Sequence, residues 1–203
     1  NGRPRIDFDL LERFKTDLIG LSGSTLGELS QHITTGKSEQ FIKERIEYYQ
    51  NIFGTEDFYL EIQEHPERGN QPKINEYLVA LSKKYGYPLV ATNNSYYLKE
   101  DDKEAQDLFS CIGDGRPLED PDRNTLIDGN YAIRSSEEMS ELFSYAPSAI
   151  ENTLRIAEKI HLHIPYGQTL IPTFELAKER QSQYDAYINS IKDSPDCIPL
   201  SSE

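Results

Sequence analysis

The sequence predicts an α/β fold in which strands and helices alternate along the chain. Three short segments have the apolar content of buried strands, and each is followed by a longer stretch whose apolar residues recur at helical spacing. The predicted strands are 18–21, 58–62 and 88–92. This order favours βαβ units, whose strands run parallel in an open sheet or in a closed barrel.

Start and stop signals bound the helices of the first half. Asp7 and Ser38 can accept hydrogen bonds from the first turn of a helix, and Pro72 suits the first turn of another. Glycines, which favour the left-handed conformation at helix ends, follow the apolar periodic stretches. The predicted helices cover 7–14, 26–35, 38–53 and 72–85.

The second half is predicted as helices separated by a long polar loop. Asp101 or Asp102 can cap a helix that reaches Ile112, and Ser135 and Glu138 have the spacing of a capping box. The other predicted segments are a polar loop at 113–130, a short strand at 131–134, a helix at 147–160, a strand in which His161 and His163 face solvent, and an irregular tail at 193–203.

The bulk composition narrows the classes of function. The 203 residues carry a net charge of −14, and Lys and Arg form no cluster, so the chain should repel the phosphate backbone of nucleic acids. No apolar run approaches membrane-spanning length, no export signal is visible, and two cysteines make no disulfide framework. We therefore expect a cytoplasmic chain without membrane contact. Because it opens on Asn1 without an initiator methionine, we interpret it as a piece of a longer protein.

The loops after the three predicted strands hold the candidate site residues. Loops that follow parallel strands meet at one end of the sheet, where the chemistry of α/β proteins usually lies. Divalent metals prefer carboxylates, imidazoles and thiolates, and only Glu64 and His65 qualify, so a hydrolytic metal centre is not predicted. The candidates are Ser22, Ser24, Glu64, His65, Asn93, Asn94, Ser95 and Tyr96.

These candidates also have plainer interpretations. His65 reads as a solvent-exposed loop residue, and the side chains of 93–95 as an Asx turn that satisfies the backbone after a strand. Ser24, His65 and Asp101 can be written down as a catalytic triad, but no spacing supports it. The residues alone predict an α/β domain whose loops lack an adequate catalytic set.

Several segments, in order and at family-like spacing, carry a resemblance to a known family. They are P-R-I-D at 4–7, L-I-G-L-S-G-S-T-L-G-E at 18–28, F-Y-L-E-I-Q at 58–63, P-L-V-A-T-N at 88–93, D-P-D-R at 120–123, Y-A-I-R at 131–134, S-E-E-M at 136–139 and I-P-T-F at 171–174. Over roughly residues 3–175 the chain resembles the polymerase-and-histidinol-phosphatase (PHP) domain of bacterial DNA polymerase III alpha subunits.

The resemblance implies the later part of a seven-stranded (β/α) barrel, with the N-terminal strands missing and a helical C-terminal extension. Residues 1–165 would be a partial PHP domain, and 166–203 a linker or the start of the polymerase core. An H-x-H metal motif would lie upstream, and the acidic residues of the polymerase site downstream. A barrel without its first strands exposes sheet edges and apolar helix faces, so we expect self-association or a rearranged sheet.

The resemblance also assigns metal-ligand positions. Family members that bind metal have a cysteine where this chain has Ser24, and an aspartate and a histidine where it has Asn94 and Tyr96. Amide and phenol oxygens do not replace a carboxylate and an imidazole at neutral pH. We therefore expect three degenerate ligand positions, with His65 and Asn93 lining the site, no bound metal or other cofactor, and no catalytic residue.

The expected function is that of one part of a replicative DNA polymerase, a nucleotidyltransferase that uses Mg²⁺. This segment would be an inactive structural platform and a docking surface. Its partners would be the rest of the alpha subunit, a proofreading exonuclease and other replisome proteins, with DNA contacted only through the parent. The alternatives are a free-standing metal-dependent phosphoesterase of the PHP superfamily, against which the three ligand positions argue, and an interaction module with no polymerase attached.

Overall fold

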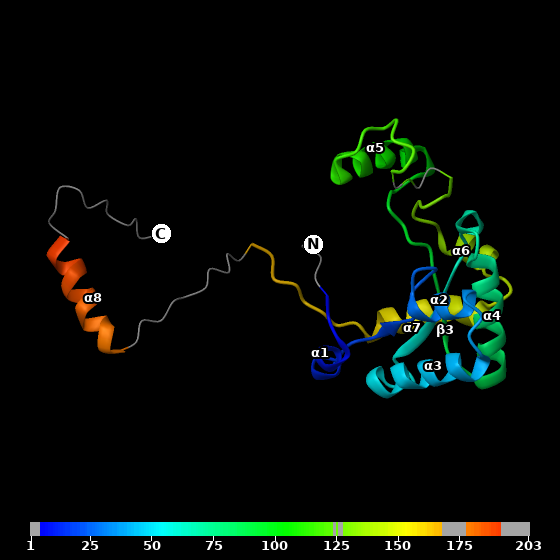
Figure 1. The fold of residues 1–203 in the computed structure, drawn as a ribbon, viewed down its shortest axis with the longest axis horizontal. Helices are drawn as coiled ribbons and strands as arrows, with labels where there is room; N and C mark the ends of the chain where they lie inside the picture. Colours follow the sequence, from blue (N-terminus) through cyan, green and yellow to red (C-terminus); the bar gives the residue numbers. More distant parts are fainter. Residues whose placement is uncertain (1–4, 124, 126–127, 168–177, 192–203) are drawn as a thin grey trace. The chain divides into compact units, whose positions relative to one another are not determined.

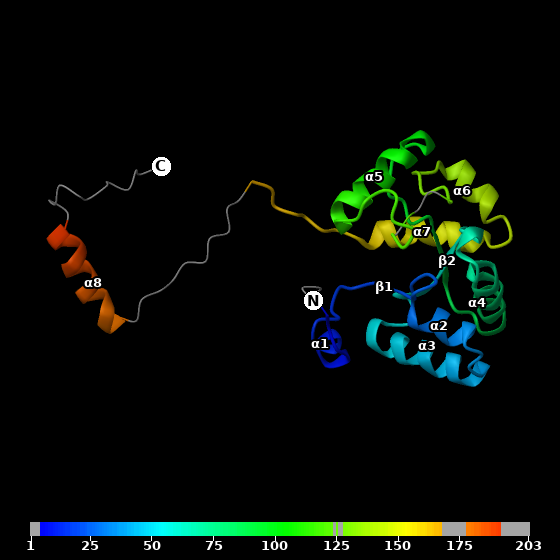
Figure 2. The same ribbon diagram turned by 45° about the horizontal axis from the view of Figure 1, so that its top comes forward.

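The computed structural model describes residues 5–123, 125, 128–167 and 178–191, which divide into two compact units at His161 and Leu162 (Figures 1 and 2). The elements of the first unit are α1 (Phe8–Arg13), β1 (Gly20–Leu21), α2 (Glu28–Thr34), α3 (Glu39–Phe53), β2 (Phe58–Gln63), η1 (Pro66–Arg68), α4 (Gln71–Tyr85), β3 (Leu89–Thr92), η2 (Glu100–Asp102), α5 (Lys103–Asp114), α6 (Ser136–Leu142) and α7 (Pro147–Lys159). The second unit contains α8 (Lys178–Ile191), so the expected C-terminal extension includes a helix. No helix in the described ranges is both long and apolar enough to cross a membrane.

The three strands form one parallel sheet in the order β1-β2-β3. Gly20 pairs with Phe58, and Leu60 pairs with Leu89. Parallel neighbours need a crossover connection, and here α2 and α3 link β1 to β2 while α4 links β2 to β3. The predicted α/β alternation and parallel pairing are therefore confirmed.

The strand β1 is shorter than the predicted 18–21, because only two residues pair. Where it ends, the Ser22 hydroxyl continues the ladder by accepting a hydrogen bond from the Glu61 amide at 2.9 Å. Gly20 lets the strand approach α3, since a Cβ atom there would lie 2.7 Å from the Phe53 ring.

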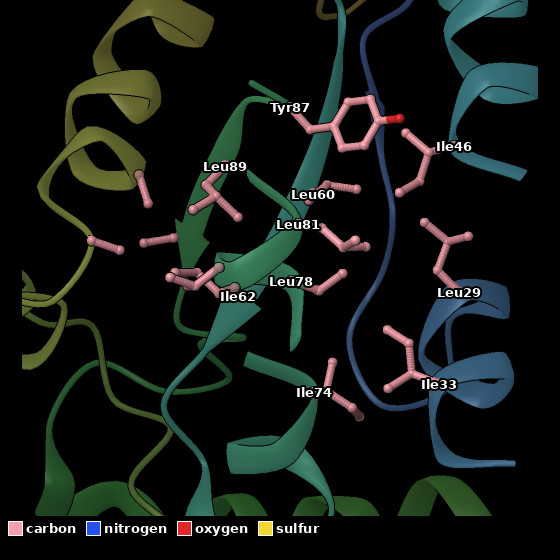
Figure 3. Close-up of a cluster of buried hydrophobic side chains, with 14 of the residues drawn as sticks. Leu29, Ile33, Ile46, Leu60, Ile62, Ile74, Leu78, Leu81, Tyr87 and Leu89 are labelled. Atoms are coloured by element: carbon pink, nitrogen blue, oxygen red, sulfur yellow. The ribbon is translucent and has the colours of Figure 1, made fainter. Parts of the chain in front are cut away.

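The main core lies between the sheet and the helices α2, α3 and α4 (Figure 3). Leu60 and Ile62 project from one face of β2 and are fully buried. They belong to one apolar cluster with Leu29 of α2, Ile46 of α3 and Leu78 of α4. The apolar stripes of three helices thus cover one face of the sheet.

The helix α7 runs along β3, which is an edge strand of the described sheet. Its Asn152 side chain is buried and donates a hydrogen bond to the Leu89 carbonyl at 2.7 Å. An unpaired strand edge presents backbone groups that need partners. Asn152 therefore satisfies part of the β3 edge with a side chain instead of a further strand.

The predicted helix caps are confirmed at three of four positions. The side chains of Asp7, Ser38 and Ser135 accept hydrogen bonds from the first turns of α1, α3 and α6. Asp102 precedes α5 but makes no side-chain cap for it. Its carboxylate instead accepts from the backbone amide of Lys99 at 3.0 Å, because the chain enters α5 through the short helix η2.

Arg45 of α3 joins three helices. Its guanidinium forms a two-bond ion pair with Glu28 of α2, with N–O distances of 2.8 and 3.1 Å. It also lies over the rings of Phe8 in α1 and Tyr48 in α3, while the Tyr49 hydroxyl donates to Glu28. Burial raises the pKa of Glu28, but the hydrogen bonds from Arg45 and Tyr49 outweigh it and lower that pKa below its usual value.

One further predicted strand is reduced and another is absent. At 131–134 the structure has a single parallel bridge, between Tyr97 and Ala132. The Ile133 amide donates to the Tyr97 carbonyl there. Residues 161–164 form no strand, and Leu162 is 76% exposed there. The tail at 193–203 lies outside the described residues.

The burial of Leu60 in the core leads to a first prediction, on the free energy of unfolding. Leu60→Ala should lower the free energy of unfolding by about 2–5 kcal/mol, because it removes buried methyl groups and leaves a cavity. Leu154→Ala, at a position 63% exposed on α7, is the matched control and should change it by less than about 0.5 kcal/mol. Urea denaturation followed by circular dichroism measures both, and equal losses would contradict the described core.

The lowered pKa of Glu28 makes a second prediction. A carboxylate whose pKa is lower in the folded than in the unfolded state adds stability above its unfolded pKa, and that stability is lost as the pH falls through the folded pKa. Glu28→Gln should therefore cost no more than about 1 kcal/mol at pH 7, the range for partly exposed pairs. The difference from wild type should shrink below the usual carboxyl pKa in a series of urea titrations. A difference that grows on acidification would show that the pair is not formed.

Candidate functional site

The loops that follow the three strands all lie at the carboxyl end of the parallel sheet. They comprise residues 22–27 after β1, 64–68 after β2 and 93–97 after β3. All candidate residues from the sequence lie in these loops. Hydrogen bonds link the loops to one another and to α4, so the structure brings the candidates into one connected region.

His65 is buried, with only 1% of its surface exposed, so the prediction of a solvent-exposed residue is wrong. Its Nε2 lies 2.8 Å from the Asn93 carbonyl, and its Nδ1 lies 3.1 Å from Glu67 Oε1. The ring stacks on Tyr131 at 4.2 Å between centroids. Because Nε2 must donate to the carbonyl, it offers no lone pair to a metal in this arrangement.

Ser24 is joined to α4. Its hydroxyl donates to Gln71 Oε1 at 3.3 Å, and Gln71 Nε2 donates to Asn75 Oδ1 at 2.8 Å. Asn75 Nδ2 lies 2.7 Å from the carbonyl oxygen of the last β2 residue and 3.3 Å from Glu64 Oε1. The Tyr145 hydroxyl donates to the same Glu64 oxygen at 2.6 Å. The side chain at the predicted ligand position is thus one end of a chain of hydrogen bonds.

Asn93 ties the β3 loop to the segment that follows α5. Its amide donates to the Ala132 carbonyl at 2.6 Å, and its Oδ1 accepts from Arg134 Nε at 3.1 Å. Both polar atoms of the side chain are therefore engaged. These bonds hold backbone and side chains in a polar turn, in keeping with the simpler interpretation of 93–95.

Asn94 and Tyr96 have different surroundings. Asn94 has φ = 52°, in the left-handed region that asparagine tolerates better than most residues. The Tyr96 side chain is half exposed and meets Tyr131 edge to face at 6.0 Å between centroids, while its backbone amide donates to the Tyr131 carbonyl. Amide and phenol groups are the only side-chain donors that these two positions offer.

The described residues contain no group of three or more His, Cys, Asp or Glu side chains arranged to hold a metal ion. The triad written from Ser24, His65 and Asp101 is not assembled either. The hydrogen bonds of Ser24 and His65 go to other residues, and Asp101 is exposed in η2. The donor set at this edge does not fit a divalent metal or a nucleophilic triad.

The face of the sheet opposite the core carries a polar row. Gln63 Nε2 donates to Glu61 Oε1 at 3.0 Å and to Thr92 Oγ1 at 2.8 Å, and the Thr92 hydroxyl also donates to Glu61. Gln63 Oε1 is buried without a hydrogen-bond partner among the described residues. The same face also holds the buried Tyr59 and Val90, so it is polar only toward the carboxyl ends of the strands.

Sequence reasoning missed the residues that complete these contacts. Glu67, Gln71, Asn75, Tyr131 and Tyr145 each bond or stack on a strand-end loop, but no local pattern marks them. Their electrostatics follow from the packing. Burial and the hydrogen bond to Glu64 raise the pKa of Tyr145 far above its usual value, and burial raises the pKa of Tyr131. Both hydroxyls therefore stay protonated at neutral pH.

Asn75 provides a third prediction. Asn75→Ala should lower the free energy of unfolding by about 1–3 kcal/mol, because it leaves the Gln71 amide and a β2 carbonyl buried without partners. Asn51→Ala, at an exposed position of α3, is the matched control and should stay within about 0.5 kcal/mol of wild type. Urea denaturation compares them. Equal free energies of unfolding for the two variants would show that the hydrogen bonds of Asn75 do not stabilise the fold.

Comparison with known proteins places the chain. A PHP-domain family profile matches residues 1–65. DNA polymerase III subunit alpha of Borreliella burgdorferi is 39% identical over 178 residues, which are 87% of this chain and 15% of that protein. The subunits of Treponema pallidum, at 32% over 181 residues, and Campylobacter jejuni, at 35% over 185 residues, cover 89% and 87% of the chain and 15% of their own length.

The chain thus spans about 15% of the length of these relatives. The similarity extends over most of the chain, well beyond the PHP match. On these grounds the chain belongs to the family of DNA polymerase III alpha subunits, as a fragment that includes PHP-domain sequence.

Proposed function

We propose that the parent protein is a DNA-directed DNA polymerase of bacterial replication, and that this segment is an inactive PHP domain that serves as its structural platform. Residues 1–165 would be the partial PHP domain, and 166–203 the start of the connection to the polymerase core. The observation that carries the structural role is the use of the strand-end side chains. Ser24, His65 and Asn93 form hydrogen bonds with other parts of the same chain.

The degenerate ligand positions support this role. A serine hydroxyl bonded to Gln71, an asparagine in a left-handed turn and a half-exposed tyrosine stand at 24, 94 and 96. Neither amides nor phenols are good ligands for the metals of hydrolytic sites. Hydrogen bonds that join three loops and α4 instead give this end of the sheet a fixed shape, which a platform requires.

The seven-stranded barrel is part of the same proposal. β1 and β3 are the outer strands of the described sheet, and Leu21 of β1 is 43% exposed. Parallel sheets are usually covered on both faces. Strands of the parent that precede β1 would extend the sheet toward a barrel and shield the polar row on its inner face.

The parent polymerase would use Mg²⁺ held by carboxylates outside this chain, since paired metals clamp the attacking and leaving oxygens of such a displacement. DNA would be bound through the parent, because the −14 net charge of this segment opposes contact with phosphates. The partners of the platform would be the rest of the alpha subunit, a proofreading exonuclease and other replisome subunits, in the cytoplasm. The free-standing phosphoesterase remains the rival function.

One experiment separates the two functions. The purified parent subunit is assayed for primer extension with Mg²⁺ and for Mn²⁺-dependent phosphoester hydrolysis, together with its metal content. We expect extension, no hydrolysis above background and no metal bound through Ser24, Asn94 or Tyr96. Asn94→Ala should change the rate of extension by less than about twofold, since it touches no reacting group.

The ligand-restoring variant with Ser24→Cys, Asn94→Asp and Tyr96→His is the positive arm, and Asn51→Asp on α3 is the matched charge control. The restored variant should bind more Zn²⁺ or Mn²⁺ than wild type by elemental analysis, and the control should not. Hydrolysis by the wild-type subunit that disappears in Asn94→Ala would establish the rival function. A subunit that extends no primer would overturn the polymerase assignment.

A further inference from the structure

The helix α5 turns its apolar side to solvent. Ala105, Leu108, Phe109 and Ile112 have the i, i+3, i+4, i+7 spacing of one helix face. Leu108 is 49% exposed, Phe109 72% and Ile112 77%. Figure 1 shows α5 standing away from the sheet and from α2, α3 and α4, and its main neighbour among the elements is η2. We call these four residues the α5 face.

The opposite side of α5 is polar and packed. Asp107 is 5% exposed and pairs with Arg123 of the following loop at 2.5 Å, and it also accepts from the Thr125 hydroxyl at 2.7 Å. Cys111 is buried on the same side. The hydrogen bonds from Arg123 and Thr125 lower the pKa of Asp107, so the pair stays charged at neutral pH. Arg123 and Thr125, in the predicted polar loop at 113–130, are therefore packed against α5.

This ion pair fixes which side of α5 faces outward. A rotation of the helix that buried the α5 face would expose Cys111 and separate Asp107 from Arg123. Breaking a buried ion pair is strongly destabilising when a charge is left without its partner. Arg116 is also held inside the loop, by Asp120 at 3.0 Å. The apolar side is thus presented to solvent by fixed contacts.

The α5 face lies in an acidic part of the chain. Residues 98–130 contain ten Asp and Glu against four Lys and Arg, a net charge of −6. A second copy of this chain would bring the same negative charge, and the chain as a whole carries −14. Like charges oppose self-association, so charge complementarity calls for an occupant with Lys or Arg around an apolar centre.

We infer that the α5 face is covered by a segment of the parent subunit outside these 203 residues, in which apolar side chains are flanked by Lys or Arg. This inference rests on the proposed function, in which the chain is one part of a much longer polypeptide. The matched relatives devote only 15% of their length to this region. A segment on the same polypeptide acts at a high effective concentration, so it outcompetes a separate protein of similar affinity.

The test uses the purified parent subunit and measures the rate at which maleimide labels single positions, followed by mass spectrometry of the labelled peptides. Ile112→Cys reports on the α5 face. Glu104→Cys, at an exposed position beside the α5 face on the same helix but outside it, is the matched control. Each rate is divided by the rate of the same variant unfolded in urea. We expect Ile112→Cys to react at least about tenfold more slowly than Glu104→Cys.

A photo-crosslinking amino acid in place of Ile112 identifies the occupant. We expect a crosslink within one polypeptide, to a peptide that carries Lys or Arg beside apolar residues. Equal labelling of Ile112→Cys and Glu104→Cys overturns the inference. So does protection that is lost on dilution, which points to a second copy, or protection that needs another added protein, which points to a separate partner. A crosslink to a peptide without Lys or Arg overturns the charge argument.

Failure of this inference is distinguishable from failure of the proposed function. A subunit that extends primers but leaves Ile112→Cys fully reactive disproves the covering segment and leaves the polymerase assignment standing. A subunit that protects Ile112→Cys but extends no primer does the reverse. Primer extension by both cysteine variants also shows that they are folded.

Discussion

The parallel pairing of β2 with both β1 and β3 is the constraint on which the rest of the first unit depends. Parallel neighbours cannot be joined by a tight turn, so the chain must cross over through helices between strands. Those helices lie on the sheet, and their apolar stripes make the core around Leu60 and Ile62. The same pairing sends the carboxyl ends of all three strands to one edge, which is why loops distant in sequence meet there.

At that edge the chain pairs its polar groups with one another. His65 is held by Asn93 and Glu67, and Asn75 connects Gln71 to the end of β2. Buried polar groups need partners, and a site that binds a ligand must leave some of them available until the ligand arrives. The bonds of these side chains within the protein stabilise the loops, and they also remove the donors that a metal or substrate would use. The polar atoms of these loops can either hold the loops together or bind a ligand, and here they hold the loops together.

The elements that rest on local signals were predictable from the sequence. Apolar periodicity and caps such as Ser38 and Ser135 located the helices, and the order of segments indicated the parallel sheet. The errors arose where a distant residue decides the outcome. His65 is buried because Tyr131, far along the chain, covers its ring, and nothing near His65 in sequence signals this. The strand expected at 131–134 is limited to one bridge, and its partner Tyr97 lies far from it along the chain.

The chain has two kinds of surface, one with polar groups that are paired and one with apolar groups that are exposed. At the carboxyl ends of the strands, the side chains of Ser24, His65 and Asn93 have hydrogen-bond partners within the chain. At α5 the polar groups are also paired, through Asp107 and Arg123, but the apolar groups remain in water. A contiguous exposed apolar face held in place by an ion pair behind it is a feature of an interface, because folding alone would have buried it. The chain therefore pairs these polar side chains internally and leaves the α5 face without apolar contacts among the described residues, as expected for one part of a larger subunit.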